Sequence, residues 1–142
     1  MPLQYTVDTG ALGSQLAKLQ NPKLITGILD EAQAILLNRI RQRFLNETDP
    51  DGAPWSHSRA GIKRRALGGP GTLFNTGKLF HSIHLFASTQ EGRSFGTDIP
   101  YAGQHNFGTD GMVKRQFMGF SDEDTNLMVN LVFKRVTEAL DG

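Results

Sequence analysis

The sequence predicts an α+β fold, in which a small antiparallel sheet is packed by a long N-terminal helix and a C-terminal helix. Two observations predict it. Apolar residues recur at every third or fourth position near both ends of the chain, and between them the apolar period shortens to two. The chain has 142 residues, of which 38% are hydrophobic, and this size suits a single domain over residues 1–142 with a modest core.

The N-terminal helix is predicted to begin at Asn21-Pro22 and to run to about residue 45. Asn21 can cap exposed amides, and Pro22 fits the first helical turn because the N–H that it lacks would have no partner there. One continuous apolar stripe follows, formed by Ile25, Ile28, Leu29, Ala32, Ile35, Leu36, Ile40 and Phe44.

The C-terminal helix is predicted to begin after Ser121 and to run to about residue 140. Ser121 stands three residues before the carboxylate of Asp124, as in a capping box, and the acidic first turn suits the positive end of the helix dipole. Its apolar stripe consists of Leu127, Met128, Leu131, Val132, Val136, Ala139 and Leu140.

The middle of the chain has the signature of strands and turns. Residues 79–87 alternate with a period of two and carry apolar groups on both faces, which predicts a strand, and residues 93–97 predict a shorter one. Residues 101–107 allow one or two helical turns, which Gly108 stops. Another strand is predicted over residues 112–120.

Two segments fit neither period. Residues 1–20 form either a strand with a short helix or a flexible arm. Residues 46–71 are rich in glycine and proline and poor in apolar groups, so we predict a long mobile loop between the first helix and the sheet. Trp55 is the exception in this loop: it either packs back onto its own domain or anchors a partner protein.

Charge is distributed unevenly along the chain. Residues 39–65 carry seven basic residues and three acidic ones, whereas the last 22 residues carry five acidic and two basic ones. A nucleic-acid-binding module that uses the stretch from Arg39 to Arg65 is one interpretation, although no aromatic residues are interleaved with the basic ones. The others are a solvated surface and head-to-tail self-association, with the basic part of one subunit meeting the acidic part of the next.

Catalytic and cofactor sites find little support. The segment from Gly71 to Leu79 differs from a phosphate-binding loop in spacing and leads into a predicted strand. His81 and His84 would lie on opposite strand faces, so they do not make a metal site. We do not interpret Ser82 and His84 as a nucleophile with its base. We therefore expect no enzyme activity, cofactor, metal or small-molecule substrate. The absence of cysteine excludes a disulfide framework, and no apolar run approaches the roughly 20 residues that span a membrane.

Several short motifs occur in a fixed order between and around the predicted helices. They are Asp49 to Trp55 with Asp51, Gly52 and Pro54; Thr76, Gly77 and Leu79 with Ser82; Tyr101 and Ala102 with His105 and Gly108; and Arg115 with Phe117. In this order they resemble the phage virion morphogenesis family, the tail completion proteins of Mu-like and related contractile-tailed phages. The resemblance covers roughly residues 25 to 140.

The resemblance implies a structural protein of the virion that completes the tail and enables head-tail joining, as a ring-forming homo-oligomer whose partners are other tail or neck proteins. It also implies a location in the host cytoplasm during assembly and then in the virion tail or at the head-tail junction. We expect the partner-facing surface to include Trp55, Arg59, Lys63, Arg64 and Arg65.

Overall fold

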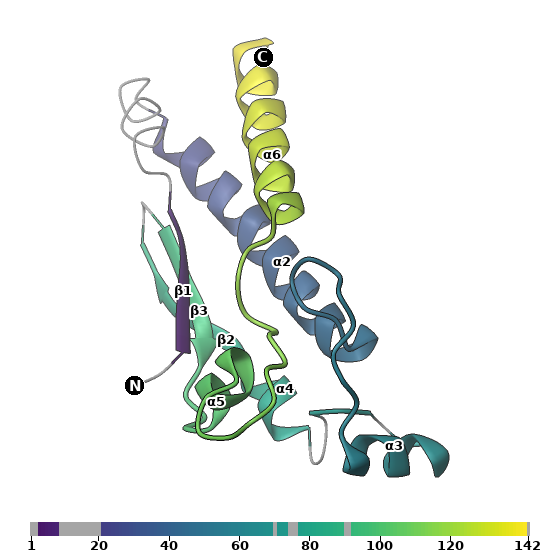
Figure 1. Cartoon of the computed structure of the whole chain (residues 1–142). Helices are drawn as coiled ribbons and strands as arrows, with labels where there is room; N and C mark the ends of the chain where they lie inside the picture. Colours follow the sequence, from purple (N-terminus) through teal and green to yellow (C-terminus); the bar gives the residue numbers. More distant parts are fainter. Residues whose placement is uncertain (1–2, 9–20, 70, 74–76, 90–91, 142) are drawn as a thin grey trace.

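The computed structural model describes residues 3–8, 21–69, 71–73, 77–89 and 92–141. Figure 1 shows a small sheet on one side of the long helix α2. The C-terminal helix α6 also packs against α2, where Ile25 and Leu29 contact Val136. The α+β prediction is confirmed. Within the described residues, no helix is both long enough and apolar enough to cross a membrane.

The two long helices form where the sequence predicts them. Helix α2 spans Pro22–Asn46, and the side chain of Asn21 accepts a hydrogen bond from the backbone N–H of Leu24. Helix α6 spans Asp122–Asp141 and begins with the predicted capping box. There, Ser121 Oγ accepts from the N–H of Asp124 at 3.0 Å, and Asp124 Oδ2 accepts from the N–H of Ser121 at 2.9 Å.

The sheet has three antiparallel strands in the order β1-β3-β2. Strand β1 (Leu3–Asp8) pairs with β3 (Gly92–Thr97), and β3 pairs with β2 (His84–Ser88). A side chain at Gly96 in β3 would lie 1.9 Å from the carbonyl oxygen of Leu3, so the close pairing of β1 with β3 requires glycine there. Residues 3–8 thus follow the strand alternative, while residues 9–20 lie outside the described part.

The core lies between the sheet and the C-terminal half of α2. Phe95 in the central strand is fully buried against this half of α2, with which residues of α4 and of the segment before α6 also pack. The main cluster comprises Leu36, Ile40, Phe44, Trp55, Leu79, Ile83, Phe95, Ile99, Ala102, Phe117 and Met118. Burial of each leucine, isoleucine, phenylalanine or methionine side chain in this cluster contributes about 1.5–3 kcal/mol to the stability of the fold.

Two predicted strands are wrong in part or in full. The start of the predicted strand 79–87 instead belongs to the short helix α4 (Lys78–Ser82), and only the second half of that prediction forms β2. Leu79 and Ile83 are both buried and lie four residues apart, a spacing that suits a helix as well as it suits a covered strand. The predicted strand 112–120 is an irregular extended segment, because its backbone bonds to side chains and to α5 (Ala102–Phe107) rather than to a strand.

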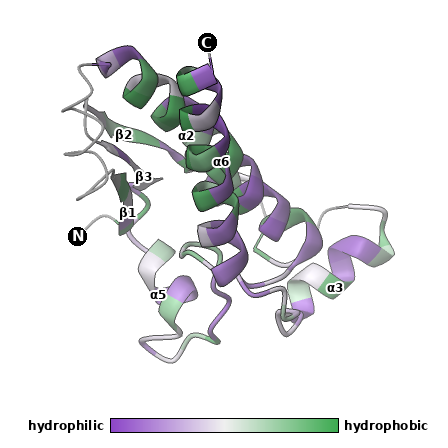
Figure 2. Cartoon of the chain, turned by 90° about the horizontal axis from the view of Figure 1, so that it is seen from above, coloured by the Kyte–Doolittle hydropathy of each residue, from purple (hydrophilic) through white to green (hydrophobic). Residues whose placement is uncertain are grey.

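The segment predicted to be a mobile loop contains a helix. Helix α3 spans Arg59–Ala66, and Ser58 caps it by accepting from the N–H of Gly61 at 2.9 Å. Helix α3 was not predicted because its sequence has few apolar residues, and a helix that packs little against a core has no apolar stripe. Figures 1 and 2 show α3 projecting away from the sheet and from α6. The mobility of residues 46–71 stays a prediction.

Candidate functional site

The Asp-Pro-Asp-Gly-Ala-Pro-Trp motif forms a tight turn at the end of α2. Asp49 Oδ1 accepts hydrogen bonds from the N–H groups of Asp51 and Ala53, both at 2.9 Å. Gly52 has a φ of 89°, a conformation that favours glycine, and Pro54 forms an isolated bridge with Thr48. The turn therefore reverses the chain and places Trp55, the last residue of the motif, in the core.

Trp55 is a core residue in this structure. Its side chain is 4% exposed and its Nε1–H donates to the carbonyl of Gln116 at 2.9 Å. Its ring meets Phe44 edge-on, with the centroids 5.7 Å apart. The structure thus favours packing onto its own domain over anchoring a partner, and we leave Trp55 out of the surface proposed below.

Glu47 binds the C-terminal turn of α3 and the segment that follows it. This residue was not predicted from the sequence. Its buried carboxylate accepts from the N–H of Thr72 at 2.5 Å and from Arg65 Nη2 at 2.7 Å. Burial alone would raise the pKa of Glu47, but the hydrogen bond from Thr72 and the charge of Arg65 outweigh it, so this pKa lies below its usual value. No sequence pattern marks Glu47, because its partners are 18 and 25 residues away.

Helix α3 carries the four predicted basic interface residues. Arg59, Lys63 and Arg65 are exposed, whereas Arg64 is half-buried and donates through Nη2 to the carbonyl of Gly71 at 2.6 Å. Two apolar side chains share the helix and its end: Ile62 is 58% exposed and Leu67 is 82% exposed. The surface of α3 is therefore both basic and apolar.

Much of the rest of the basic stretch is neutralised inside the molecule. Arg43 Nη2 lies 2.5 Å from Asp124 Oδ2, and Arg39 pairs with Asp124 and with Glu123. With the Arg65–Glu47 pair, at least three of the seven basic residues between Arg39 and Arg65 have carboxylate partners within the described part of the chain. Fewer cations therefore remain for the phosphates of a nucleic acid than the sequence indicates.

Residues from three separate motifs meet around one pocket of about 620 Å³. They are Leu79 from α4, Tyr101 from the N-cap of α5, His105 from α5 itself, and Arg115 from the segment that follows. The N–H of Arg115 donates to the carbonyl of His105 at 2.8 Å, which joins two of these motifs. Ser58, Ala60, Arg64, Leu73, Lys78 and Met112 complete the described lining.

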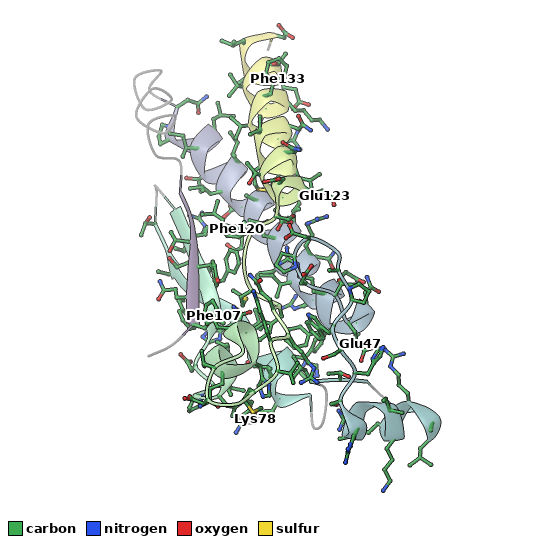
Figure 3. The ribbon with its side chains drawn as sticks, in the orientation of Figure 1. Glu47, Lys78, Phe107, Phe120, Glu123 and Phe133 are labelled. Atoms are coloured by element: carbon green, nitrogen blue, oxygen red, sulfur yellow. The ribbon has the colours of Figure 1, made fainter. Side chains whose placement is uncertain are left out.

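The pocket is basic. Arg64, Lys78 and Arg115 line it, and none of its described lining residues is acidic. Figure 3 shows Lys78 at the end of the molecule that carries α4 and α5. Burial lowers the pKa of His105, as does the charge of Arg115, so the imidazole favours its neutral form. The buried Nδ1 of His105 has no hydrogen-bond partner within the described part of the chain.

Other motif residues have structural roles. Gly77, with a φ of 74°, precedes α4, and Gly108, with a φ of 69°, ends α5. Ser82 Oγ bonds to the carbonyl of Leu79 and to Thr97 Oγ1, both at 2.6 Å.

Two further motif residues, Ala102 and Phe117, have no exposed surface and belong to the core. Sequence reasoning missed the buried Asn106, whose Oδ1 accepts from the N–H groups of Phe117 and Met118. Thr76 lies outside the described residues.

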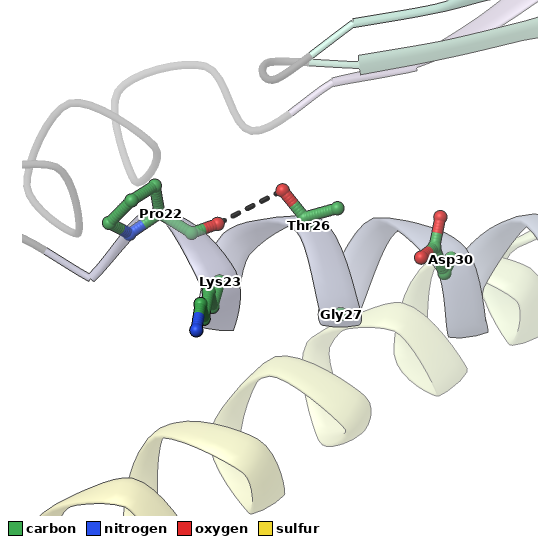
Figure 4. Close-up of a pocket in the computed structure, with 5 residues that line it drawn as sticks. All are labelled: Pro22, Lys23, Thr26, Gly27 and Asp30. Carbon is green, nitrogen blue, oxygen red and sulfur yellow. Dashed lines mark hydrogen bonds between the residues drawn. The ribbon is translucent and has the colours of Figure 1, made fainter.

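Other candidate sites are weak. Among the described residues, the pocket in Figure 4, of about 330 Å³, is lined by residues of α2 alone, and its hydrogen bond joins Thr26 Oγ1 to the carbonyl of Pro22 within that helix. The described lining therefore brings together no groups from different elements, as a ligand site requires. Among the described residues, no cluster of His, Asp and Glu could hold a metal ion.

Helix α6 exposes an apolar surface. Val129 is 59% exposed, and Phe133 and Leu140 are each 74% exposed. Their spacings of four and seven residues place them on the same side of the helix. Figure 2 shows hydrophobic stretches along α6, and Figure 3 marks Phe133 on this helix.

These features describe a small α+β protein with exposed apolar side chains on α3 and α6 and a basic pocket. Residues 7–137, nearly the whole chain, match the phage virion morphogenesis family, and the chain belongs to that family. It therefore has a role in phage virion morphogenesis. Comparison with curated proteins found no match, and comparison with solved structures found none either.

Proposed function

We propose that this chain is a structural protein that completes the phage tail and enables head-tail joining, as a ring-forming homo-oligomer without enzyme activity. The exposed apolar surface of α6, formed by Val129, Phe133 and Leu140, is the observation that carries the proposal. A contiguous apolar helix face on a small protein marks a contact with another protein.

The surfaces of α3 and α6 complement each other. Helix α3 combines basic residues with the exposed Ile62 and Leu67, and α6 combines its apolar face with the exposed acids Asp122 and Asp141. Figure 1 places the two helices at opposite ends of the molecule. A contact between two different surfaces repeats from copy to copy and closes into a ring when the rotation allows it.

The partners that this function implies are other tail or neck proteins, in the host cytoplasm during assembly and then in the virion tail or at the head-tail junction. The alternative is a nucleic-acid-binding module that uses Arg39 to Arg65. It is the weaker candidate, because Arg39, Arg43 and Arg65 already pair with carboxylates of the chain itself. A short DNA duplex separates the two, since a binding module retains it on a gel at moderate salt and loses it steeply as salt rises.

Disruption of the gene tests the function. We expect electron microscopy of the lysate to show separate heads and tails that accumulate without joining. Complementation with the intact gene should restore joined particles. Normal infectious particles from the disrupted phage would contradict the proposal.

The α6 surface is tested with purified protein. Phe133→Glu places a charge on the apolar face and should shift the protein toward monomer in sedimentation velocity. Asn130→Glu adds the same charge at another exposed position of α6 and is the matched control. Equal sedimentation of the Phe133 variant, the control and the unmodified protein at all concentrations would remove α6 from the interface.

A further inference from the structure

The pocket between α3, α4 and α5 contains a buried arginine whose charge the described chain does not balance. Arg115 is 8% exposed, and its Nε–H donates to the carbonyl of Ser56 at 2.7 Å. Within the described residues, its Nη1 and Nη2 have neither a hydrogen-bond acceptor nor a carboxylate partner.

The other buried arginines differ. Arg43 is 6% exposed and pairs with Asp124, and Arg93 is 3% exposed and pairs with Asp30 at 2.9 Å. Taking a guanidinium out of water is costly unless an anion and hydrogen bonds compensate it. Arg115 is thus the one buried arginine of the described chain that lacks such an anion.

We propose that this pocket is a carboxylate-binding site, which receives an Asp or Glu side chain of a partner tail protein on the two free nitrogens of Arg115. The planar guanidinium binds a carboxylate through two parallel hydrogen bonds. Arg64 and Lys78 add positive charge around the same pocket. The site deepens the proposed structural function and rests on it for the identity of the partner as a tail protein.

The walls of the pocket favour a peptide over a nucleic acid. Leu73, Leu79 and Met112 line it together with the ring of Tyr101, and these groups suit the carbon stem of an acidic side chain and its apolar neighbours. Nucleic-acid phosphates are bound by rows of exposed cations rather than by one buried guanidinium. Since the ring contact proposed above uses the acids of α6 for α3, we assign the carboxylate to a different protein.

Nuclear magnetic resonance of the full chain tests the site without the partner. The hydrogen-bonded Nε–H of Arg115 provides one signal and the ring of His105 another. N-acetyl-glutamate N-methylamide should shift both signals saturably, and N-acetyl-glutamine N-methylamide, which lacks the charge, should not. A bound carboxylate should also raise the pKa of His105, because it offsets the charge of Arg115.

Variants identify the residue responsible. Arg115→Met should weaken binding of the glutamate probe at least about tenfold, measured at the His105 ring, since charged hydrogen bonds are lost. Arg115→Lys keeps the charge without the fork and should bind with intermediate affinity. Arg41→Met, at an exposed position of α2, is the matched control and should bind as the unmodified protein does.

Three results would overturn the proposal. Equal shifts from the glutamate and glutamine probes would remove the carboxylate. Larger shifts from inorganic phosphate or a short DNA duplex at the same concentration would show that the pocket binds phosphate groups in preference to carboxylates. Shifts of Arg115 that follow protein concentration alone would assign it to a second copy. Each result leaves the gene disruption experiment intact, so failure of the pocket and failure of the tail function remain distinguishable.

Discussion

Two buried arginines, Arg43 and Arg115, have opposite surroundings. At the junction of α2 and α6, Arg43 pairs with Asp124 and also donates to the carbonyls of Phe117 and Gly119 at 3.0 and 2.9 Å. In the pocket beside α5, the side chain of Arg115 donates only through Nε among the described residues, to the carbonyl of Ser56. Both side chains are more than nine-tenths buried.

The comparison separates a charge that holds the fold from a charge available to a partner. Burial alone does not make the distinction, because the exposed fractions of Arg43 and Arg115 differ by only two percentage points (6% and 8%). The distinction lies in who supplies the anion. Asp124 supplies it within the chain at the first site, whereas the second site requires it from outside.

Asp124→Asn should have the largest effect, because it leaves Arg43 buried without a counter-charge. We expect the free energy of unfolding to fall by about 3–5 kcal/mol, measured by urea denaturation. Glu123→Gln is the control, since its side chain is 73% exposed and should contribute about 0.5 kcal/mol or less. Equal losses from the two variants would contradict the role of Asp124 as the counter-charge that holds Arg43 in the fold.

Trp55→Ala tests the core that lies between the two arginines. We expect a loss of about 3 kcal/mol, since the indole fills a buried site beside Phe44 and its hydrogen bond to Gln116 is removed. Thermal unfolding followed by circular dichroism measures it. Unchanged stability together with failed tail assembly would restore Trp55 as a partner contact.

The helices and the central strand could be predicted because their signals are local. The cap at Asn21 and the capping box at Ser121 each lie within a few residues of the apolar stripe that follows. Strand β3 ends at Thr97, three residues before Pro100. By contrast, α4 was predicted as a strand because Leu79 and Ile83 fit both periods, and only packing against β3 and α2 decides between them.

The site could be predicted only as a set of motif residues. That Leu79, Tyr101, His105 and Arg115 share a pocket depends on α4 and α5 packing side by side, which no spacing in the sequence encodes. The basic stretch misled for a related reason. Its arginines count as free charges in the sequence, but two of them, Arg39 and Arg43, pair with Asp124, which lies 81 residues beyond Arg43.

Acid should destabilise the two regions at different pH values. Burial would raise the pKa of Asp124, but the bonds from Ser121 and Arg39 outweigh it and the pKa is lowered, so this contribution is present above pH 4 and is lost as the pH falls through the folded pKa. The pKa of His105 lies below 6.5, so the unfolded chain binds a proton that the folded protein does not, and stability falls below about pH 6.5.

Urea denaturation between pH 7 and pH 3 measures both effects. His105→Gln should flatten the stability curve between pH 7 and 5, where one proton accounts for at most about 1.4 kcal/mol per pH unit. Asp124→Asn should flatten the stability curve below pH 4 and leave its slope between pH 7 and 5 unchanged. A His105 variant with the slope of the unmodified protein would separate the imidazole from the pocket's electrostatics.

Arg115→Met should have the smallest effect on stability, and this makes it the sharpest test of the comparison. The variant loses the bond to Ser56, worth about 1 kcal/mol, and at the same time removes a guanidinium that is buried without an anion. The two terms oppose each other, so we expect a change within about 1 kcal/mol in urea denaturation. Arg43→Met, at equal burial, should cost several-fold more, since Asp124 loses a buried partner. A loss at Arg115 as large as that at Arg43 would mean that the chain itself supplies the missing anion, and the charge at α5 would then hold the fold as the charge at α6 does.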